Sequence, residues 1–529
     1  MKVSLIDRRK TKYFSALSND YLYDTKKFDN FIERPFTIEN IISQARIKAS
    51  HFTNHSREKL VDTIQEQYRG LNIHDATKCN IESLRNEHTF TVTTGHQLNL
   101  FGGPLYVTYK IIQAIKIAEQ ASKHSTEFKF VPIFWMATED HDFLEINHLN
   151  IFGQKIEWQT KQNGAVGRFT FEDFEAFRDL LSSYFENSSE IKNIISNFYS
   201  NSDINLSVAT RRFINELFGK YGLVILDGDS AVLKKSFTEI AQKELLENFT
   251  YSTIQSKSKQ IAELGYKLQV NPREVNLFLL EKNKRQRIIK KDNYFVIGEK
   301  KYSLNEILNL VKKDPSTISP NVLLRPVYQE IILPNVAYIG GGAEISYWLQ
   351  LKDIFNSLNL DFPILNIRNS FQIFPSEILK RIQNLKISIS DFFDDKEKII
   401  KEFIFTQSKS ELDFSSIENC LTQLNEEIQE KIIGLDPNLA QYAQSEIIKQ
   451  KKLVDSIKQK LIKHQKNKFD TSVLQIERLF NKIFPNNGLQ ERHENLLSMG
   501  SIYGIEGFIG MIYESCNIEF CDLILLHDE

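Results

Sequence analysis

Four ionisable residues, Glu139–Asp142, stand together directly after the mostly apolar run Phe130–Ala137. Charged groups beside a buried strand cost free energy unless they are solvated, paired or used. Crowded carboxylates shift one another's pKa, and a histidine among them tends to have a raised pKa. Asp140 and His141 are therefore a candidate general-base pair for an attacking amine. The candidate substrate-binding residues around them are Glu139, Asp142, Asn147 and His148.

The same cluster leaves two alternatives open. One is a metal site, although the spacing matches no defined ligand pattern. Its ligands would be Asp140, His141, Asp142 and His148. The other is a solvated loop, which a position over the edge of a sheet disfavours.

A second polar cluster, Gly95-His96-Gln97, follows the β-prone run Phe90–Thr94. The loop Gly102–Pro104 then leads into a predicted helix at Leu105–Ala121. Such a loop presents free backbone N–H groups to an anion, although it has neither dinucleotide-binding nor Walker A spacing. The alternative is a glycine-rich connection with a structural histidine, whereas we expect His96 to be catalytic. The substrate-binding candidates are Gly95, Gln97, Asn99, Gly102, Gly103, Tyr106 and Lys110.

A third cluster lies at 321–344. Val322–Val327 is a predicted strand, and its Arg325 could pair bidentately with a carboxylate or phosphate. Three glycines before the predicted helix Ile345–Leu358 favour a backbone nest against a ligand. Glu344 either suits the dipole of the first helical turn or faces a substrate ammonium. The substrate-binding candidates are Arg325, Gly340, Gly341, Gly342 and Glu344.

Weaker signals come from three other segments. Pro485–Arg492 is typical of a turn, but its polar side chains could line a pocket. Asp227-Gly-Asp229 ends a strand and is typical of a turn. Arg285 and Arg287 stand in a basic run that is more typical of a solvated strand face than of a phosphate clamp. The candidate cofactor-binding residues are Asn487, Gly488, Gln490 and Arg492.

Strands and helices alternate over most of the first 374 residues. This pattern predicts an α/β fold with a doubly wound parallel sheet, in which ligands bind at the carboxyl ends of the strands. The predicted strands are Thr89–Thr94, Phe128–Ala137, Gly222–Asp227, Val322–Val327 and Phe362–Ile367. Between them we predict helices at Leu105–Ala121, Ser207–Lys220 and Ile345–Leu358. Insertions are expected at about 152–202 and 249–317, the second with a hairpin of Tyr266–Val270 and Val275–Glu281.

The segment 375–484 predicts a different architecture. Between positions 343 and 487 the only glycine is Gly434. Apolar residues recur at helical and heptad spacing, which predicts an antiparallel coiled coil with a turn at Gly434–Pro437. The expected seam residues are Ile417, Leu421, Leu424, Ile428, Ile447, Val454, Ile457 and Leu461. Residues 485–529 are expected to return to the core.

Bulk composition excludes several classes of protein. The 529 residues imply two or three domains, and 66 basic against 68 acidic residues argue against nucleic acid as the main partner. The four cysteines, Cys79, Cys420, Cys516 and Cys521, include no Cys-x-x-Cys, so reduced thiols are expected. No signal peptide and no apolar run of membrane-spanning length is found, so we expect a cytoplasmic protein without a membrane partner.

The ordered motifs resemble the cysteine ligases of bacillithiol biosynthesis over nearly the whole chain. The matching blocks are Thr94–Gln97, Gly103–Tyr106 with Lys110, Phe134-Trp135, Glu139–Asp142, Glu145–His148, Leu324–Pro326, Tyr338–Gly341 with Glu344, and Gly488–Arg492. Members from Gram-positive bacteria commonly carry Gln at the position of His96 and Gly-Pro-Gly-Glu where this chain has Gly341-Gly-Ala-Glu344.

The resemblance implies a Rossmann-like core, two connective insertions and a long helical coiled-coil domain that makes a homodimer. It also implies amide bond formation between cysteine and glucosaminyl malate, the last step of bacillithiol biosynthesis, with ATP or ADP bound. No metal is expected in the core site. The alternatives are a metal-dependent hydrolase that uses the Glu139–Asp142 cluster and a non-enzymatic coiled-coil scaffold.

Overall fold

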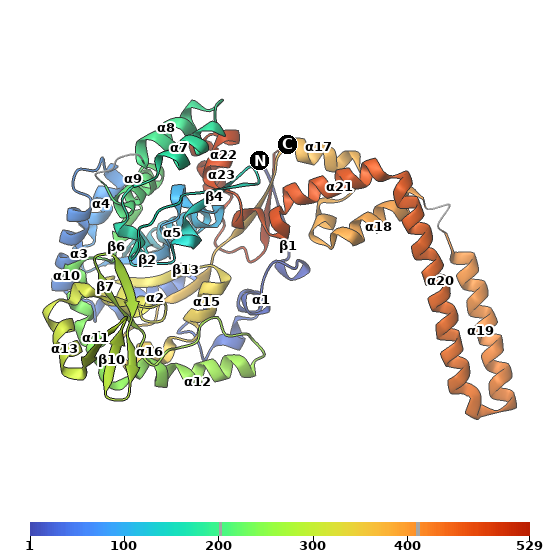
Figure 1. The fold of residues 1–529 in the computed structure, drawn as a ribbon, viewed down its shortest axis with the longest axis horizontal. Helices are drawn as coiled ribbons and strands as arrows, with labels where there is room; N and C mark the ends of the chain where they lie inside the picture. The colour runs from blue at the N-terminus through green and yellow to red at the C-terminus, as the bar shows by residue number, and fades with distance from the viewer. Residues whose placement is uncertain (200–203, 409–412, 529) are drawn as a thin grey trace.

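The computed structural model describes residues 1–199, 204–408 and 413–528. Its centre is a five-stranded, all-parallel sheet in the order β14-β13-β2-β3-β6 (Figure 1). The strands are β2 (Thr89–His96), β3 (Lys129–Met136), β6 (Val224–Asp227), β13 (Asn335–Gly340) and β14 (Ile364–Ile367). Gly95 lies opposite Trp135 and His96 opposite Met136, so the first two clusters share one edge of the sheet, as the sequence predicts.

Helices cover both faces of this sheet. On one face, Phe90 and Val92 of β2 pack with Ala114 and Ala118 of α5 (Leu105–His124). Alternate residues of a strand point to opposite faces. On the other face, Tyr338 of β13 packs on Trp348 of α15 (Gly342–Trp348), with the ring centroids 4.5 Å apart. Two-sided burial explains why the strands are almost wholly apolar or threonine-rich.

The N-terminal helices and the segment between β3 and β6 surround the sheet. They are α1 (Ala16–Tyr23), α2 (Ile38–Ala49), α3 (Asn54–Gln67), α4 (Asp75–Ser83), α6 (Phe143–Ile146), α7 (Glu175–Ser183), α8 (Ser189–Phe198) and α9 (Leu206–Phe218), with the hairpin β4 (His148–Ile151) and β5 (Gln154–Glu157). The predicted end of the first insertion, at about residue 202, lies outside the described residues.

A second insertion separates β6 from β13. Its helices are α10 (Ala231–Lys234), α11 (Thr238–Glu247), α12 (Phe249–Glu263), α13 (Leu304–Lys313) and α14 (Arg325–Ile332). Its strands form two antiparallel sheets, β12 (Ile318–Pro320) with β7 (Leu277–Glu281) and β8 (Lys284–Arg287), and β11 (Lys300–Ser303) with β10 (Tyr294–Ile297) and β9 (Ile289–Lys291).

Three predicted elements are wrong. Val322–Val327 is no strand: the Asn321 side chain accepts the N–H groups of Leu323 and Leu324 at 2.9 and 3.2 Å, which turns the chain into α14. Pro326 fits that helix because its first turn needs no N–H donor. The strand at this place in the sheet is β13.

The predicted hairpin of Tyr266–Val270 with Val275–Glu281 is also wrong. β7 pairs instead with β8 and β12, because a tight turn at Lys282-Asn283 returns the chain. The predicted helix Ile345–Leu358 is two helices, α15 and α16 (Lys352–Ser357).

A second, three-stranded sheet joins the two chain ends. β16 (Leu523–His527) pairs antiparallel with β1 (Lys2–Ile6) and parallel with β15 (Ser370–Phe374), which follows β14 directly. The side chains of β15 and β16 pack in an apolar cluster with α17 (Ser376–Asn384), α18 (Lys396–Gln407) and α21 (Asp470–Ile483). This cluster fixes the base of the arm.

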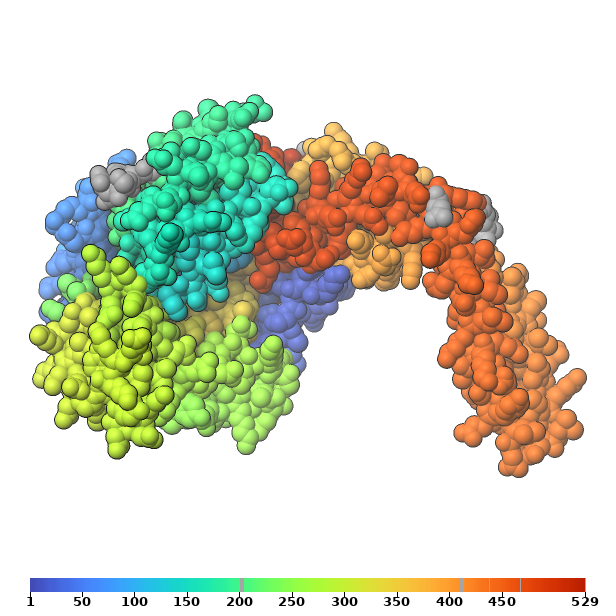
Figure 2. Space-filling model, in the orientation of Figure 1, coloured from blue at the N-terminus to red at the C-terminus, as the bar shows by residue number. Residues whose placement is uncertain are grey.

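The arm itself is a pair of long helices, α19 (Ser415–Leu435) and α20 (Ala440–Lys468), joined at Asp436–Leu439 (Figures 1 and 2). The helical hairpin and its turn are as predicted. The seam is correct in part: Leu421, Ile428, Ile447 and Val454 are half-buried, whereas Ile417, Leu424, Ile457 and Leu461 remain exposed.

Two apolar helices follow the arm, α22 (Leu496–Tyr503) and α23 (Ile505–Ser515), and meet at 100°. Among the described residues, no single helix is long and apolar enough to cross a membrane, although this bent pair meets the criterion when its two helices are joined. In the fold, α22 packs near α8 and α23 packs on α5.

Candidate active site

A cavity of about 600 Å³ opens at the carboxyl edge of the parallel sheet. The ends of β2, β3 and β13 line one side of it, and residues of the second insertion line the other. Two smaller cavities, of about 460 and 180 Å³, adjoin it, and Arg492 lines all three. The predicted residues that line the large cavity are Gly95, His96, Gln97, Tyr106, Glu139, Asp140, His141, Asp142, Arg325, Gly341, Gly342, Glu344 and Arg492.

Asp140 and His141 are held by two neighbours. Gln97 donates through Nε2 to Asp140 Oδ2 at 2.8 Å, and Arg285 Nη1 lies 3.1 Å from His141 Nδ1 and 3.6 Å from Asp140 Oδ1. Burial alone would raise the pKa of Asp140, but His141, Gln97 and Arg285 hold it well below its usual range. Asp140 is therefore an anion at neutral pH.

The Arg285 contact fixes which ring nitrogen of His141 carries the proton when the imidazole is neutral. A guanidinium only donates, so His141 Nδ1 accepts, and in the neutral imidazole the proton sits on Nε2. Arg285 also donates to Ser319 Oγ at 3.1 Å and to the carbonyl of Pro320 at 2.9 Å. Its side chain is 8% exposed, so the interpretation of Arg285 as part of a solvated strand face is wrong. The sequence gives no signal for this contact, because it joins two distant segments.

The candidate metal ligands converge in part. Ligand atoms of Asp140, His141 and Asp142 lie within 4.8 Å of one another, whereas His148 lines the small cavity. The Arg285 guanidinium stands against two of the three groups and supplies a positive charge there. Two of the three candidate metal ligands, Asp140 and His141, thus already have a positively charged side chain as a partner.

The floor of the cavity is an ion pair between a buried lysine and a partly exposed glutamate. Lys110 Nζ is 2.7 Å from Glu344 Oε2 and also donates to the carbonyl of Gly95, and its side chain is 1% exposed. Glu344 further accepts the N–H of Gly341 at 2.8 Å and the hydroxyl of Tyr338 at 3.0 Å. Burial would raise the pKa of Glu344, but Lys110 and the Gly341 N–H lower it to about 2. Glu344 thus caps the N-terminus of α15, and the ion pair with Lys110 holds the Glu344 carboxylate in place.

His96 lies between this floor and Tyr106. The Tyr106 hydroxyl is 3.3 Å from His96 Nε2, and the two rings meet edge to face. Burial, with the charge of Lys110, lowers the pKa of His96 to about 3. The imidazole is therefore neutral at physiological pH and suits hydrogen bonding better than proton abstraction.

Arg325 is available to a ligand. It donates to Gln329 Oε1 at 3.1 Å and to the Tyr347 hydroxyl at 3.0 Å, and no carboxylate of the described residues pairs with it. Arg273 and Arg287 of the second insertion line the same cavity. An arginine without a carboxylate partner is suited to bind a carboxylate or phosphate of a substrate.

The remaining predicted residues lie elsewhere. Asn99, Gly103 and His148 line the small cavity. Gly102 faces Phe213, Gly340 lies beneath Glu344, and Asn147 donates to the carbonyl of Trp158. Gln490 accepts the N–H of Ile373 of β15, so it fixes the fold. Asn487 and Gly488 form a turn, with His493 beside Gly488, and of the four cofactor candidates Arg492 alone reaches the described cavities.

Sequence reasoning missed several lining residues. Arg368 follows β14 and forms a bidentate pair with Glu491, with both N···O distances 2.7 Å. It directly follows the predicted strand Phe362–Ile367, so the same reasoning that places Gly95 and Glu139 at the carboxyl edge of the sheet also applies to Arg368. Tyr338, Tyr347 and Arg273 line the cavity as well. Tyr338 opens the motif block Tyr338–Gly341 but is not among the predicted site residues, and no motif singles out Tyr347 or Arg273.

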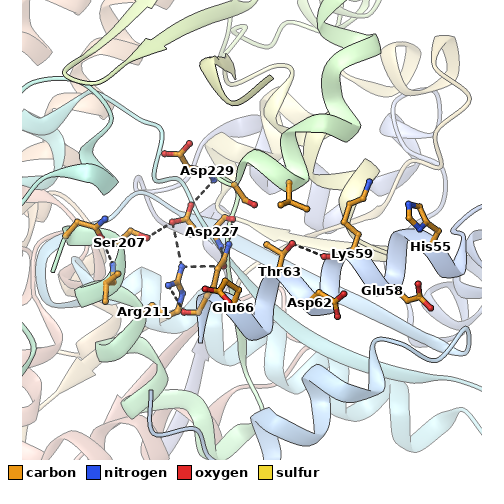
Figure 3. Close-up of a pocket in the computed structure, with 15 residues that line it drawn as sticks. His55, Glu58, Lys59, Asp62, Thr63, Glu66, Ser207, Arg211, Asp227 and Asp229 are labelled. Atoms are coloured by element: carbon orange, nitrogen blue, oxygen red, sulfur yellow. Dashed lines mark hydrogen bonds and ion pairs between the residues drawn. The ribbon is translucent and has the colours of Figure 1, made fainter. Parts of the chain in front are cut away.

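Another cavity, of about 630 Å³, lies between α3, α9 and the end of β6 (Figure 3). There Asp227 accepts hydrogen bonds from Ser207 and Thr138 and lies 3.7 Å from Arg211. Asp229 pairs with Arg168 and Lys234. These charged groups satisfy one another, which is the pattern of structural ion pairs.

Two family models cover almost the whole chain. The model described as "Bacillithiol biosynthesis BshC, N-terminal Rossmann-like domain" matches residues 1–369, and the one described as "Bacillithiol biosynthesis BshC, C-terminal coiled-coil domain" matches 371–521. Three similar proteins carry the name "Putative cysteine ligase BshC". They come from Flavobacterium johnsoniae (40% identity, 94% of each chain), Flavobacterium psychrophilum (41%, 94% of each) and Christiangramia forsetii (39%, 96% of each).

Proposed function

The chain belongs to the bacillithiol biosynthesis BshC family, and from this membership we propose that it is a ligase that joins the carboxyl group of cysteine to the amine of glucosaminyl malate. The names of the relatives support a ligase rather than a metal-dependent hydrolase or a scaffold. The structural observation that carries the proposal is the cavity of about 600 Å³, which gathers at one sheet edge the predicted base pair and arginines that pair with no carboxylate of the described residues.

The cavity suits glucosaminyl malate in both charge and size. The malate group carries two carboxylates, and Arg325, Arg273 and Arg287 line the cavity as candidate partners. Volumes of about 300–1,000 Å³ are usual for sites that enclose a small molecule.

The reaction needs an activated cysteine, because a carboxylate does not react with an amine at a useful rate. We propose ATP as the co-substrate. A carboxylate oxygen of cysteine attacks phosphorus, giving an acyl phosphate and ADP or an acyl adenylate and pyrophosphate. The amine nitrogen then attacks the acyl carbon, the amide bond forms, and phosphate or AMP departs. Lys267 and Arg492, which line the adjoining cavity of about 460 Å³, supply positive charge for the nucleotide.

The attacking amine must lose a proton, and we assign its removal to His141 with Asp140 beside it. Arg285 Nη1 occupies the Nδ1 lone pair of His141. An anionic substrate group that draws Arg285 away would free this lone pair, and the Asp140 carboxylate would then stabilise the imidazolium that forms. In this mechanism the base becomes available only when substrate is bound.

Reconstitution with purified components tests the function. The full chain with cysteine, glucosaminyl malate and ATP should form bacillithiol, detected by mass spectrometry, together with ADP or AMP. His141→Gln and Asp140→Asn should lower kcat by about 10²–10⁴-fold while the protein stays folded. If folded wild-type protein forms no bacillithiol with any nucleotide, the proposal is wrong. Elemental analysis that finds no stoichiometric metal in the purified protein would count further against the hydrolase alternative.

We also propose a homodimer that forms through the arms, in the cytoplasm where the nucleotide is made. The two-helix arm exposes apolar side chains that its own pairing leaves uncovered, including Leu424 at 51% and Leu453 at 63% exposure. Large apolar side chains exposed on one element are typical of an interface with another chain.

A further inference from the structure

A cavity of about 180 Å³ branches from the large one between the loop 97–104, the β4–β5 hairpin and the segment 492–495. Gln97, Tyr106 and Arg492 line both cavities, so the two communicate there. The volume equals that of about six water molecules. It suits a small amino acid and is too small for a sugar–malate conjugate.

Asn99 lines this small cavity, and its side chain holds a buried acceptor without a partner in the described part of the chain. The side chain of Asn99 is 8% exposed, and its Oδ1 receives no hydrogen bond from the described residues. A buried acceptor without a donor destabilises the folded state. A ligand with an N–H group would remove this cost.

The position of Asn99 is built into the loop. Gly103 has φ +67°, and a Cβ there would lie 2.5 Å from Asn99 Cβ. Any other residue at 103 would displace Asn99 from the cavity wall, so the glycine preserves the unsatisfied acceptor.

Charges of opposite sign stand at two points of the same cavity. Glu145 lines it, with Oε2 accepting from Gln97 Nε2 at 2.8 Å, and Arg492 stands where it joins the large cavity. Neither has an ion-pair partner among the residues that the structure describes. An ammonium and a carboxylate on one small ligand match this arrangement.

Two histidines complete the lining. Burial lowers the pKa of His148 and of His493, so both imidazoles are neutral at physiological pH. A neutral imidazole can accept the weak S–H hydrogen bond of a thiol without ionising it.

We propose that this small cavity is the cysteine-binding site, with Asn99 and Glu145 at the ammonium and Arg492 at the carboxylate. The thiol lies beside His148 and His493. This inference rests on the proposed ligase function and specifies where its amino-acid substrate binds. The carboxyl group then faces the large cavity, where activation and attack take place, and amino acids with longer side chains are excluded by size.

Direct binding of radiolabelled cysteine to the full chain, with and without a non-hydrolysable ATP analogue, tests the site. Asn99→Ala should weaken binding by about 10-fold or more, because hydrogen bonds to charged groups contribute about 1.5–3 kcal/mol. Glu145→Gln, at an exposed side chain, should weaken it similarly with little risk to folding. Asn271→Ala makes the same change on the large cavity and should leave cysteine affinity within about twofold.

Steady-state kinetics separates the two substrates. Asn99→Ala and Glu145→Gln should raise KM for cysteine and leave KM for glucosaminyl malate unchanged. If wild-type protein makes bacillithiol but both variants bind cysteine normally, the site is wrong and the ligase stands. If wild-type protein binds cysteine, both variants lose that binding, and no nucleotide supports bacillithiol formation, the ligase is wrong and the amino-acid site stands.

Discussion

The sheet edge and the helical arm distribute charge and apolar surface in opposite ways. At the sheet edge, charged side chains pair within one chain and are largely withdrawn from solvent, as Arg368 is with Glu491 and Lys110 with Glu344. On the arm, charged residues are solvated, and apolar ones such as Tyr442 and Leu453 are each 63% exposed. Most charged groups at the sheet edge therefore find partners within the chain, whereas the arm leaves apolar surface exposed, as is typical of an interface with another molecule.

The largest effect on assembly is expected when lysines replace apolar residues on this exposed surface of the arm. Ile417 and Leu424 stand seven residues apart, and thus on one face of α19. Burying one such side chain contributes about 1.5–3 kcal/mol. The double variant Ile417→Lys, Leu424→Lys changes two per chain, so the dimer Kd should rise by at least about 10³-fold, as sedimentation velocity would measure.

The matched control places two lysines, again seven apart, at polar exposed positions of the same helix, Gln423→Lys and Glu430→Lys. It should remain dimeric, and circular dichroism should show the same helix content for both variants. A wild-type monomer, or a dimer that both variants retain, would remove the contrast between core and arm.

A smaller effect is expected from the buried pair Arg368–Glu491. Glu491→Gln leaves a buried guanidinium without its carboxylate, so the free energy of unfolding should fall by about 3–5 kcal/mol. Glu377→Gln makes the same change in the exposed i,i+4 pair with Arg381, and it should cost less than about 0.5 kcal/mol. Urea unfolding of both variants measures the difference, and equal costs would show that burial does not distinguish the pairs.

Much of the fold follows from local patterns in the sequence. The strand-to-loop junctions at Gly95 and Glu139 meet at one edge because parallel strands joined by a helix must align their carboxyl ends. The arm follows from heptad spacing and the turn at Gly434–Pro437. The error at Val322–Val327 was also local, because the Asn321 side chain and Pro326 begin a helix where the apolar run is typical of a strand.

Other features depend on docking that no periodicity encodes. Arg285 reaches His141 across 144 residues of sequence, and its contact requires the second insertion to pack over the sheet edge. The unsatisfied oxygen of Asn99 similarly arises from the way the Gly103 loop meets the segment around Asn495, whose amide donates to the Gly103 carbonyl at 2.7 Å. Such sites are visible only once the elements are assembled.

The smallest predicted effect concerns a single carboxyl group in the core, that of Glu494. Burial raises the pKa of Glu494 to about 7, and its backbone carbonyl accepts the N–H of Leu105 at the start of α5. Because the folded pKa exceeds the unfolded one, this group's contribution to stability is complete below about pH 4.5 and is lost as pH rises through about 7.

Glu494→Gln keeps the shape of the side chain and removes its titration. The variant should match wild type most closely in urea unfolding at pH 5 and exceed it at pH 8 by on the order of 1 kcal/mol. The pH dependence carries the argument, since a purely steric change would shift stability equally at both values. A difference in stability that is constant with pH, or that favours wild type at pH 8, would show that Glu494 ionises without cost in the folded protein. The core would then tolerate an unpaired carboxylate as readily as solvent does.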